Sequence, residues 1–250
     1  MALRRILVFG ATSAIAQYVL RLLVARGASV FCVGRSAQKL DAVLRDLKVR
    51  ASGAQIIDGT VADLTTAERH PALFDRALAS LGDLDTVLVA HGVLPDQTAC
   101  EASIDATLEA VAVNGTSAIS LLTIAANLLA EKGGGVIVAI SSVAGDRGRR
   151  SNYVYGASKS LLNTFMQGIR HRLAGKGVRV VTIKPGFVDT PMTAPFDKGG
   201  PLWSEPVKIA AGIVRAMERS NGDVYLPWFW YWIMLAIRHI PERLFLRLNL

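Results

Sequence analysis

Tyr155 and Lys159 place a phenol and an ammonium group four residues apart, in a stretch whose pattern predicts a helix. Side chains at positions i and i+4 share one helix face, so the two groups should be neighbours. A nearby cation stabilises a phenolate, which predicts a pKa for Tyr155 below its ordinary value of about 10. Such a tyrosine is a candidate general acid or base near neutral pH. Taken alone, the pair is more typical of a solvated helix face.

A second group of residues could bind phosphate. The run from Gly10 to Ala16 follows a short apolar stretch and precedes a predicted helix, where a dinucleotide-binding fingerprint would lie. Backbone N–H groups and a helix N-terminus meet a pyrophosphate at such a place. Only Gly10 is a glycine, because alanines take the other two glycine positions. An ordinary strand–helix turn explains the run equally well; the candidate phosphate contacts are Gly10, Thr12, Ser13, Ala14 and Ile15.

The end of the second predicted strand bears on which nucleotide would bind. An NAD site needs a carboxylate about 20 residues after the fingerprint. That place holds Gly34, and Arg35 follows it. Because a guanidinium group suits a 2′-phosphate, we expect NADP(H) rather than NAD(H). The alternative is that Arg35 is only a surface charge.

The composition narrows the classes of function. The chain has 250 residues, 51% apolar and 19% charged, which fits one α/β domain. The formal net charge is +8, but the basic residues are spread along the chain, so we expect no nucleic-acid partner. The four histidines lack ligand spacing, and we expect no metal site. Two cysteines are too few for a disulfide scaffold and fit a cytoplasmic protein.

Apolar runs of strand length alternate with helical patterns, as in a parallel sheet covered on both faces. The predicted strands cover 5–9, 29–33, 54–58, 86–90, 135–141, 179–184 and 223–226. The predicted helices cover 13–26, 37–48, 66–81, 103–130, 153–174 and 205–219. We expect an α/β fold, a three-layer Rossmann-like doubly wound parallel sheet of about seven strands. The domain would cover 1–226 with a substrate loop at 188–206, and 227–250 would be its helical extension.

With these residues in place, the chain resembles the short-chain dehydrogenase/reductase family from about residue 3 to residue 226. Ser142 lies thirteen residues before Tyr155, which is the spacing of the family's catalytic serine, and Asn114 matches the family's asparagine. The resemblance implies a catalytic tetrad of Asn114, Ser142, Tyr155 and Lys159. It implies cofactor contacts by Tyr155 and Lys159, by Asp63 and Leu64 beside the adenine, and beside the nicotinamide by Pro185, Gly186, Val188 and Thr190.

The chain departs from the family pattern after the fourth predicted strand. The family's Asn-Asn-Ala-Gly is here Val-Ala-His-Gly, at 89–92. The first of these asparagines ties strands together, and that bond must be absent here. We expect Ala90, His91 and Gly92 still to border the cofactor, with His91 as a packing or hydrogen-bonding residue rather than a proton carrier.

The resemblance implies hydride transfer between NADP(H) and a carbonyl or alcohol carbon. Tyr155 would exchange the proton and Ser142 would hydrogen-bond the oxygen, while Lys159 would hold the nicotinamide ribose and stabilise the phenolate. Asn114 would anchor a water that links Lys159 to solvent. Relatives commonly form homodimers or homotetramers through their two long helices. The alternatives are a catalytically silent NADP(H)-binding sensor or scaffold, and a peripheral membrane protein.

The end of the chain is aromatic and then basic. Three tryptophans fall within 228–232, and arginines follow at 238, 243 and 247. The apolar run of about twelve residues is too short to span a bilayer. It suits a helix in a membrane interface, packing on its own domain, or a subunit contact. This tail and residues 90–97 also resemble reductases of keto-sugars linked to polyprenyl phosphate, which implies a lipid-linked substrate and a cytoplasmic enzyme at the inner face of the membrane.

Overall fold

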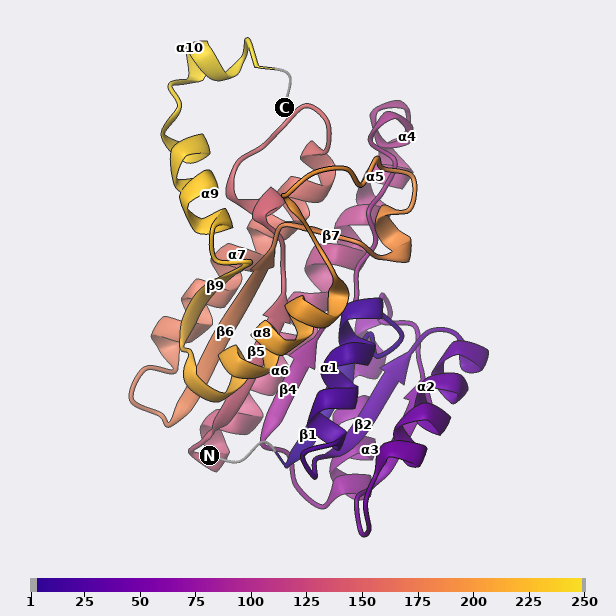
Figure 1. Ribbon diagram of the computed structural model, residues 1–250. Coiled ribbons are helices and arrows are strands. Elements are labelled where there is room, and N and C mark those ends of the chain that lie inside the picture. Colours follow the sequence, from indigo (N-terminus) through magenta and orange to yellow (C-terminus); the bar gives the residue numbers. More distant parts are fainter. Residues whose placement is uncertain (1–3, 249–250) are drawn as a thin grey trace.

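The computed structural model describes residues 4–248. Seven parallel strands form one sheet in the order β3-β2-β1-β4-β5-β6-β9 (Figure 1), which confirms the predicted doubly wound fold. The order reverses between β1 and β4, and ligands of such sheets bind beside the carboxyl ends of the strands at that reversal. The strands are β1 (Arg5–Phe9), β2 (Ser29–Gly34), β3 (Ile57–Val61), β4 (Thr86–Val89), β5 (Gly135–Ile140), β6 (Val178–Pro185) and β9 (Gly222–Leu226).

Helices cover both faces of the sheet, because successive strand residues point to opposite sides and both sides are apolar. Ile6 and Val8 face one core, which is closed by α1 (Ala14–Val24), α2 (Ala37–Arg50) and α8 (Pro206–Arg219). Leu7 and Phe9 face the other core, which is closed by α3 (His70–Leu81), α6 (Ser117–Lys132) and α7 (Tyr153–Arg172). The molecule therefore has three layers (Figure 1).

The helix predicted at 103–130 is divided in the structure. Asp96 caps α4 (Gln97–Ala102), and Ser103 ends it and caps α5 (Ile104–Val111). A π-helical turn (Ala112–Thr116) that contains Asn114 joins α5 to α6. The run Ile104–Lys132 is long and apolar enough to cross a membrane by composition. Within this run α6 lies on the sheet with its apolar face buried and is a core helix of the domain, whereas Ile104 and Leu108 on α5 are exposed.

The third strand lies three residues later than predicted. The Gln55 side chain donates to the backbone oxygens of Val24 and Ala28, both at 2.8 Å, and this holds residue 55 outside the sheet. Gly59 lies inside β3, where a Cβ would overlap the backbone oxygen of Cys32. Close approach of two backbones, rather than hydrophobicity, sets the position of this strand.

The predicted substrate loop has some regular structure. Strand β7 (Phe187–Val188) pairs with β8 (Trp203–Ser204), and a 3-10 turn (Pro191–Thr193) follows β7. Two other 3-10 turns occur at Ala67–Arg69, before α3, and at Val143–Asp146, after β5.

The C-terminal extension forms α9 (Trp230–His239) and α10 (Glu242–Phe245) and packs on its own domain. Trp230 and Met234 are buried together with Val143, the residue after Ser142. Arg147 donates to the backbone oxygens of Ile237 at 2.6 Å and Ile240 at 2.7 Å, at the end of α9. One arginine of the domain thus caps the last turn of α9 and holds the start of α10.

Candidate active site

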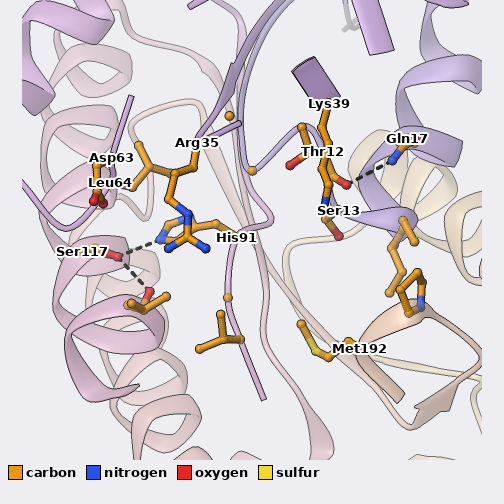
Figure 2. Close-up of a pocket in the computed structure, with 18 of the residues that line it drawn as sticks. Thr12, Ser13, Gln17, Arg35, Lys39, Asp63, Leu64, His91, Ser117 and Met192 are labelled. Atoms are coloured by element: carbon orange, nitrogen blue, oxygen red, sulfur yellow. Dashed lines mark hydrogen bonds between the residues drawn. The ribbon is translucent and has the colours of Figure 1, made fainter. Parts of the chain in front are cut away.

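A cavity of about 500 Å³ lies at the carboxyl ends of β1, β2 and β4 (Figure 2). It brings together most of the predicted cofactor-binding residues. Those that line it are Gly10, Thr12, Ser13, Ala14, Ile15, Arg35, Asp63, Leu64, His91, Gly92 and Thr190. Predicted contacts Ala90, Pro185, Gly186 and Val188 are not part of its wall, and neither are the four tetrad residues.

The loop after β1 has the geometry of a phosphate cradle. Gly10 has a φ of +80°, which a residue with a side chain rarely adopts, and a Cβ there would overlap the backbone of His91. Ser13 precedes α1, yet its side chain makes no capping hydrogen bond. The first backbone N–H groups of a helix have no partner within the helix, so they and the Ser13 hydroxyl can donate to an anion.

The far end of the cavity is cationic. Arg35 and Lys39 both line it, from the end of β2 and the first turn of α2 (Figure 2). Hydrogen bonds from Thr65 and the nearby positive charge of Arg35 lower the pKa of Asp63. Asp63 accepts from the Thr65 backbone at 2.9 Å and from its hydroxyl at 2.8 Å, which fixes the carboxylate at the rim. A phosphate beside Arg35 and Lys39 and an adenine beside Asp63 and Leu64 fit this end.

His91 occupies the floor between β1 and β4 and contacts α6. Its Nε2 lies 2.7 Å from the Ser117 hydroxyl, which in turn donates to the backbone oxygen of Val113 at 2.9 Å. Burial lowers the pKa of His91 to about 3, with the positive charge of Lys159 as a further cause. The imidazole is therefore neutral at physiological pH, and its Nδ1 has no hydrogen-bond partner among the described residues.

Asn114 and Lys159 meet next to this cavity at Gly92. A Cβ on Gly92 would lie 2.7 Å from Asn114 Oδ1 and 3.3 Å from Lys159 Nζ. Asn114 Oδ1 accepts from the Val93 backbone at 2.9 Å, and Asn114 Nδ2 donates to the Ala110 oxygen at 3.0 Å. The π-helical turn aims Asn114 inward, as such turns often do at functional sites. Only a glycine at 92 leaves both side chains this close to the cavity wall.

The environment of Tyr155 corrects the pKa expected from the sequence. Burial raises the pKa of Tyr155 to about 12, and the neighbouring Ser142 hydroxyl opposes that shift. Burial lowers the pKa of Lys159 to about 8. Lys159 Nζ lies 5.7 Å from the Tyr155 ring centroid and donates to the Ile140 oxygen at 3.3 Å. The cation is therefore near the ring, but desolvation of the phenolate is the largest cause of the shift in the Tyr155 pKa.

Ser142 is the second residue after β5 and directly precedes the 3-10 turn Val143–Asp146. Its hydroxyl accepts from the Ala144 backbone at 3.1 Å, which starts the 3-10 turn and orients the side chain. Ser141 is buried below it and donates to Asn163 Oδ1 on α7 at 2.6 Å. This bond ties the serine segment to the helix that carries Tyr155 and Lys159.

The segment predicted to hold the nicotinamide is shaped by the C-terminal extension. Thr190 lines the cavity, and its backbone N–H donates to the Thr193 hydroxyl at 3.1 Å. Gly186 lies directly under the indole of Trp230, so that a Cβ there would overlap the ring. Trp230 also packs edge-on against Phe187, with ring centroids 5.2 Å apart. The extension therefore contacts this segment directly, through Trp230.

Some residues of the cavity wall were not anticipated from the sequence: Gln17, Lys39, Val93, Val113, Ser117, Pro191 and Met192. Lys39 had a usable signal, since it follows Arg35 by four residues and enters the first turn of the next helix. Ser117 and Val113 had none, because the contact with His91 joins positions that only the packing of α6 against the sheet brings together. Gln17 donates to the Thr12 oxygen at 3.0 Å and so braces the phosphate loop.

These features fit a dinucleotide. The cavity spans the reversal of strand order, offers uncommitted donors at the start of α1, and carries two cations at its far end. Within residues 4–248 no group of three or more His, Cys, Asp or Glu side chains is arranged to hold a metal ion.

Comparison with known proteins identifies the family. The family model described as short chain dehydrogenase matches residues 4–200. The chain therefore belongs to the short-chain dehydrogenase family of oxidoreductases.

Relatives of similar length extend over nearly the whole chain. An uncharacterised oxidoreductase of Streptomyces coelicolor is 36% identical over 98% of this chain and 96% of its own length. An uncharacterised oxidoreductase of Mycobacterium tuberculosis is 33% identical over 95% of this chain and 94% of its own.

Solved structures share the fold at lower identity. An actinorhodin polyketide ketoreductase with NADPH has a TM-score of 0.78 at 22% identity, over 90% of this chain and 97% of that one. A short chain dehydrogenase of Mycobacterium paratuberculosis bound to NAD has a TM-score of 0.79 at 21% identity, over 91% and 98%. The first of these two structures thus holds NADPH and the second holds NAD.

Proposed function

We propose that this protein is an NADP(H)-dependent reductase of a carbonyl compound. The same groups would oxidise the corresponding alcohol in the reverse direction. One observation carries the proposal. Gly92 belongs to the wall of the dinucleotide cavity and also lies against Asn114 and Lys159. Asn114 and Lys159 therefore adjoin the nucleotide cavity, which favours one continuous site for the nucleotide and the proton transfer. A bound NADP(H) would supply the hydride.

The pKa values of Tyr155 and Lys159 favour a role for Tyr155 as proton donor, as carbonyl reduction requires. With a pKa of about 12, Tyr155 carries its proton at neutral pH and is ready to donate it to a carbonyl oxygen. The Ser142 hydroxyl faces the same place and would hydrogen-bond that oxygen as negative charge develops on it. Lys159, with a pKa of about 8, can pass a proton toward Tyr155 near physiological pH.

Arg35 and Lys39 support NADP(H) over NAD(H). Both line the far end of the cavity, and neither takes part in an ion pair among residues 4–248. A 2′-phosphate would neutralise them, whereas the 2′-hydroxyl of NAD would leave both cations of the wall without an anion.

The decisive test is Tyr155→Phe. We expect this variant to bind NADPH as tightly as the wild type and to lose nearly all turnover, because general acid catalysis contributes about 10²–10⁴-fold. Binding is measured by quenching of tryptophan fluorescence, and turnover by NADPH oxidation with a panel of small ketones. Tyr231→Phe is the matched control, because Tyr231 is 47% exposed on α9, away from the cavity wall. Retained turnover in Tyr155→Phe would remove the tyrosine from the mechanism.

Exposed apolar side chains on α5 and α7 support an oligomeric state. Ile104 and Leu108 on α5 and Leu161 on α7 are exposed apolar side chains, which favours a homodimer or homotetramer formed through these helices. Light scattering on the purified chain, with Leu108→Glu as the disrupting variant, tests this.

The extension presents a second apolar surface. Trp228 is 71% exposed and Trp232 is 60% exposed, which favours contact with the inner face of the cytoplasmic membrane. Such a location would suit a substrate such as a keto-sugar linked to polyprenyl phosphate. Flotation with lipid vesicles, comparing wild type with Trp228→Ser/Trp232→Ser, tests the membrane contact. Turnover of lipid extracts in the presence of NADPH tests the substrate class.

A further inference from the structure

A second cavity, of about 260 Å³, lies between the loop that precedes α7 and the C-terminal segment α10. Its wall includes the residues just before α7 and the first residue of α7, the helix that carries Tyr155 and Lys159. Guanidinium groups and apolar side chains share its wall, which includes Arg149, Arg150, Tyr153, Phe245, Leu246 and Leu248.

The positive charge at this cavity is not neutralised within the described residues. Glu242 also borders it, but Arg147 holds that carboxylate, with NH2 and Oε2 3.1 Å apart. Asp146 acts on Arg149 from nearby, but it already accepts from Lys184 at 2.8 Å and from Tyr225 at 2.5 Å. Between residues 4 and 248, Arg149 and Arg150 therefore form no ion pair with a carboxylate.

Arg149 is also poorly solvated. Its Nε is buried and has no hydrogen-bond partner among residues 4–248. Burial lowers the pKa of its guanidinium group, and the nearby charge of Asp146 offsets that shift only in part. A buried charged donor without a partner is costly, and an anion in the cavity would remove that cost.

The other side of the cavity is apolar and open to solvent. Leu246 is 74% exposed and Leu248 is 41% exposed. Phe245 lines the same cavity, and the Arg147 guanidinium stacks on its ring 3.8 Å from the centroid. A hydrocarbon chain lying along α10 would therefore cover side chains that water now surrounds.

We propose that this cavity binds an anionic amphiphile, with a phosphate or carboxylate on Arg149 and Arg150 and an apolar chain along Phe245, Leu246 and Leu248. The arginines precede Tyr155 by only six and five residues. The anion therefore anchors a substrate whose carbonyl reaches Tyr155 while its chain leaves over α10. This inference rests on the proposed function and adds the recognition of the non-reacting part of the substrate.

The test uses dodecyl phosphate below its micelle concentration as the probe, with the full chain and isothermal titration calorimetry. We expect it to bind the wild type at least about tenfold more tightly than inorganic phosphate or dodecyl maltoside, because only this probe engages both halves of the cavity. Arg149→Gln/Arg150→Gln should weaken its binding about tenfold or more. Arg243→Gln is the matched control, because Arg243 lies on the same α10 but outside the cavity wall, and it should bind as the wild type does.

A second variant separates the apolar half. Leu246→Ser should weaken dodecyl phosphate and leave the weak binding of inorganic phosphate unchanged. Dodecyl phosphate should also inhibit NADPH oxidation competitively against the carbonyl substrate. Unchanged melting temperatures of the variants exclude loss of folding as the cause.

Several results would overturn the inference. Equal binding of dodecyl phosphate and dodecyl maltoside would show that the cavity binds only the alkyl chain and that the arginines do not recognise the anion. Binding of phosphatidylglycerol vesicles without binding of monomeric dodecyl phosphate would make it a membrane contact. If the wild type reduces small ketones but does not bind dodecyl phosphate, the proposed ligand of this cavity is refuted and the proposed function is not. A wild type that binds dodecyl phosphate and reduces no carbonyl would refute the proposed function alone.

Discussion

The contact between Trp230 and Gly186 joins the C-terminal extension to the segment beside the predicted nicotinamide position. Trp230 is 2% exposed, and its indole occupies the space that a side chain at 186 would need. Gly186 has no left-handed backbone conformation, so alanine is compatible with its φ. Gly186→Ala thus perturbs this contact by steric overlap and not by backbone strain.

The expected free energies follow from the geometry. A Cβ at 186 would come too close to three atoms of a buried ring, and such overpacking costs about 1–3 kcal/mol of unfolding free energy. Trp230→Ala removes a buried aromatic side chain, which costs about 3–5 kcal/mol. In the double variant the new methyl group enters space that the indole has left. In the Trp230→Ala background, Gly186→Ala should then cost about 0 kcal/mol of unfolding free energy. The coupling energy between the two substitutions is therefore about 1–3 kcal/mol.

Urea unfolding of the wild type, both single variants and the double variant measures this coupling. Limited proteolysis should in addition cut Trp230→Ala earlier than wild type after residue 226, because α9 loses its buried anchor. Gly212→Ala is a useful comparison, since a Cβ there would lie 2.8 Å from Leu226 and does not touch Trp230. Additive costs of Gly186→Ala and Trp230→Ala would refute the packing, and so would a Gly186→Ala variant as stable as the wild type.

Three other measurements bear on the site. Arg35→Ser should weaken NADPH about 10–100-fold and leave NADH unchanged, as measured by fluorescence titration, while Arg45→Ser on the outer side of α2 should change neither. Tyr155 has a pKa of about 12, so wild type and Tyr155→Phe should show the same tyrosinate absorbance up to pH 10; extra wild-type absorbance near pH 8 would contradict that pKa. Lys184→Met leaves the buried Asp146 without its cation, while Asp223 keeps Arg170, and should cost about 3–5 kcal/mol in urea unfolding, against about 0–1 for the exposed Lys208→Met.

Much of the fold could be predicted because the local signals agree with the packing. The carboxyl end of strand Arg5–Phe9 is recognisable because the apolar run stops at Gly10, and the structure ends the strand there. The third strand was placed wrongly because its register depends on the close approach of Gly59 to Cys32 and on the bonds of Gln55. Those contacts join positions 27 to 31 residues apart, which no local pattern contains.

The candidate site shows the same division. The helical spacing of Tyr155 and Lys159 correctly predicts that the two side chains are neighbours. It gave the wrong direction for the pKa of Tyr155, because burial depends on how the whole domain encloses the ring. Lys159 also turns its amino group to the Ile140 oxygen, a partner 19 residues away.

The extension could not be placed from the sequence. Its aromatic and basic composition is compatible with a membrane, a partner or its own domain. The bonds from Arg147 to the end of α9, and the burial of Trp230 over Gly186, attach it to its own domain.

The attachment of α9 by Arg147 has a consequence for synthesis of the chain. A ribosome adds about 5–20 residues per second, so the 24 residues at 227–250 appear about 1–5 s after the last strand. Every residue that lines the dinucleotide cavity has been made before then, whereas the carbonyl groups that Arg147 binds belong to residues 237 and 240. During translation the residues of the dinucleotide cavity are therefore made first, and Arg147 can attach α9 to the domain only after residue 240 has been added.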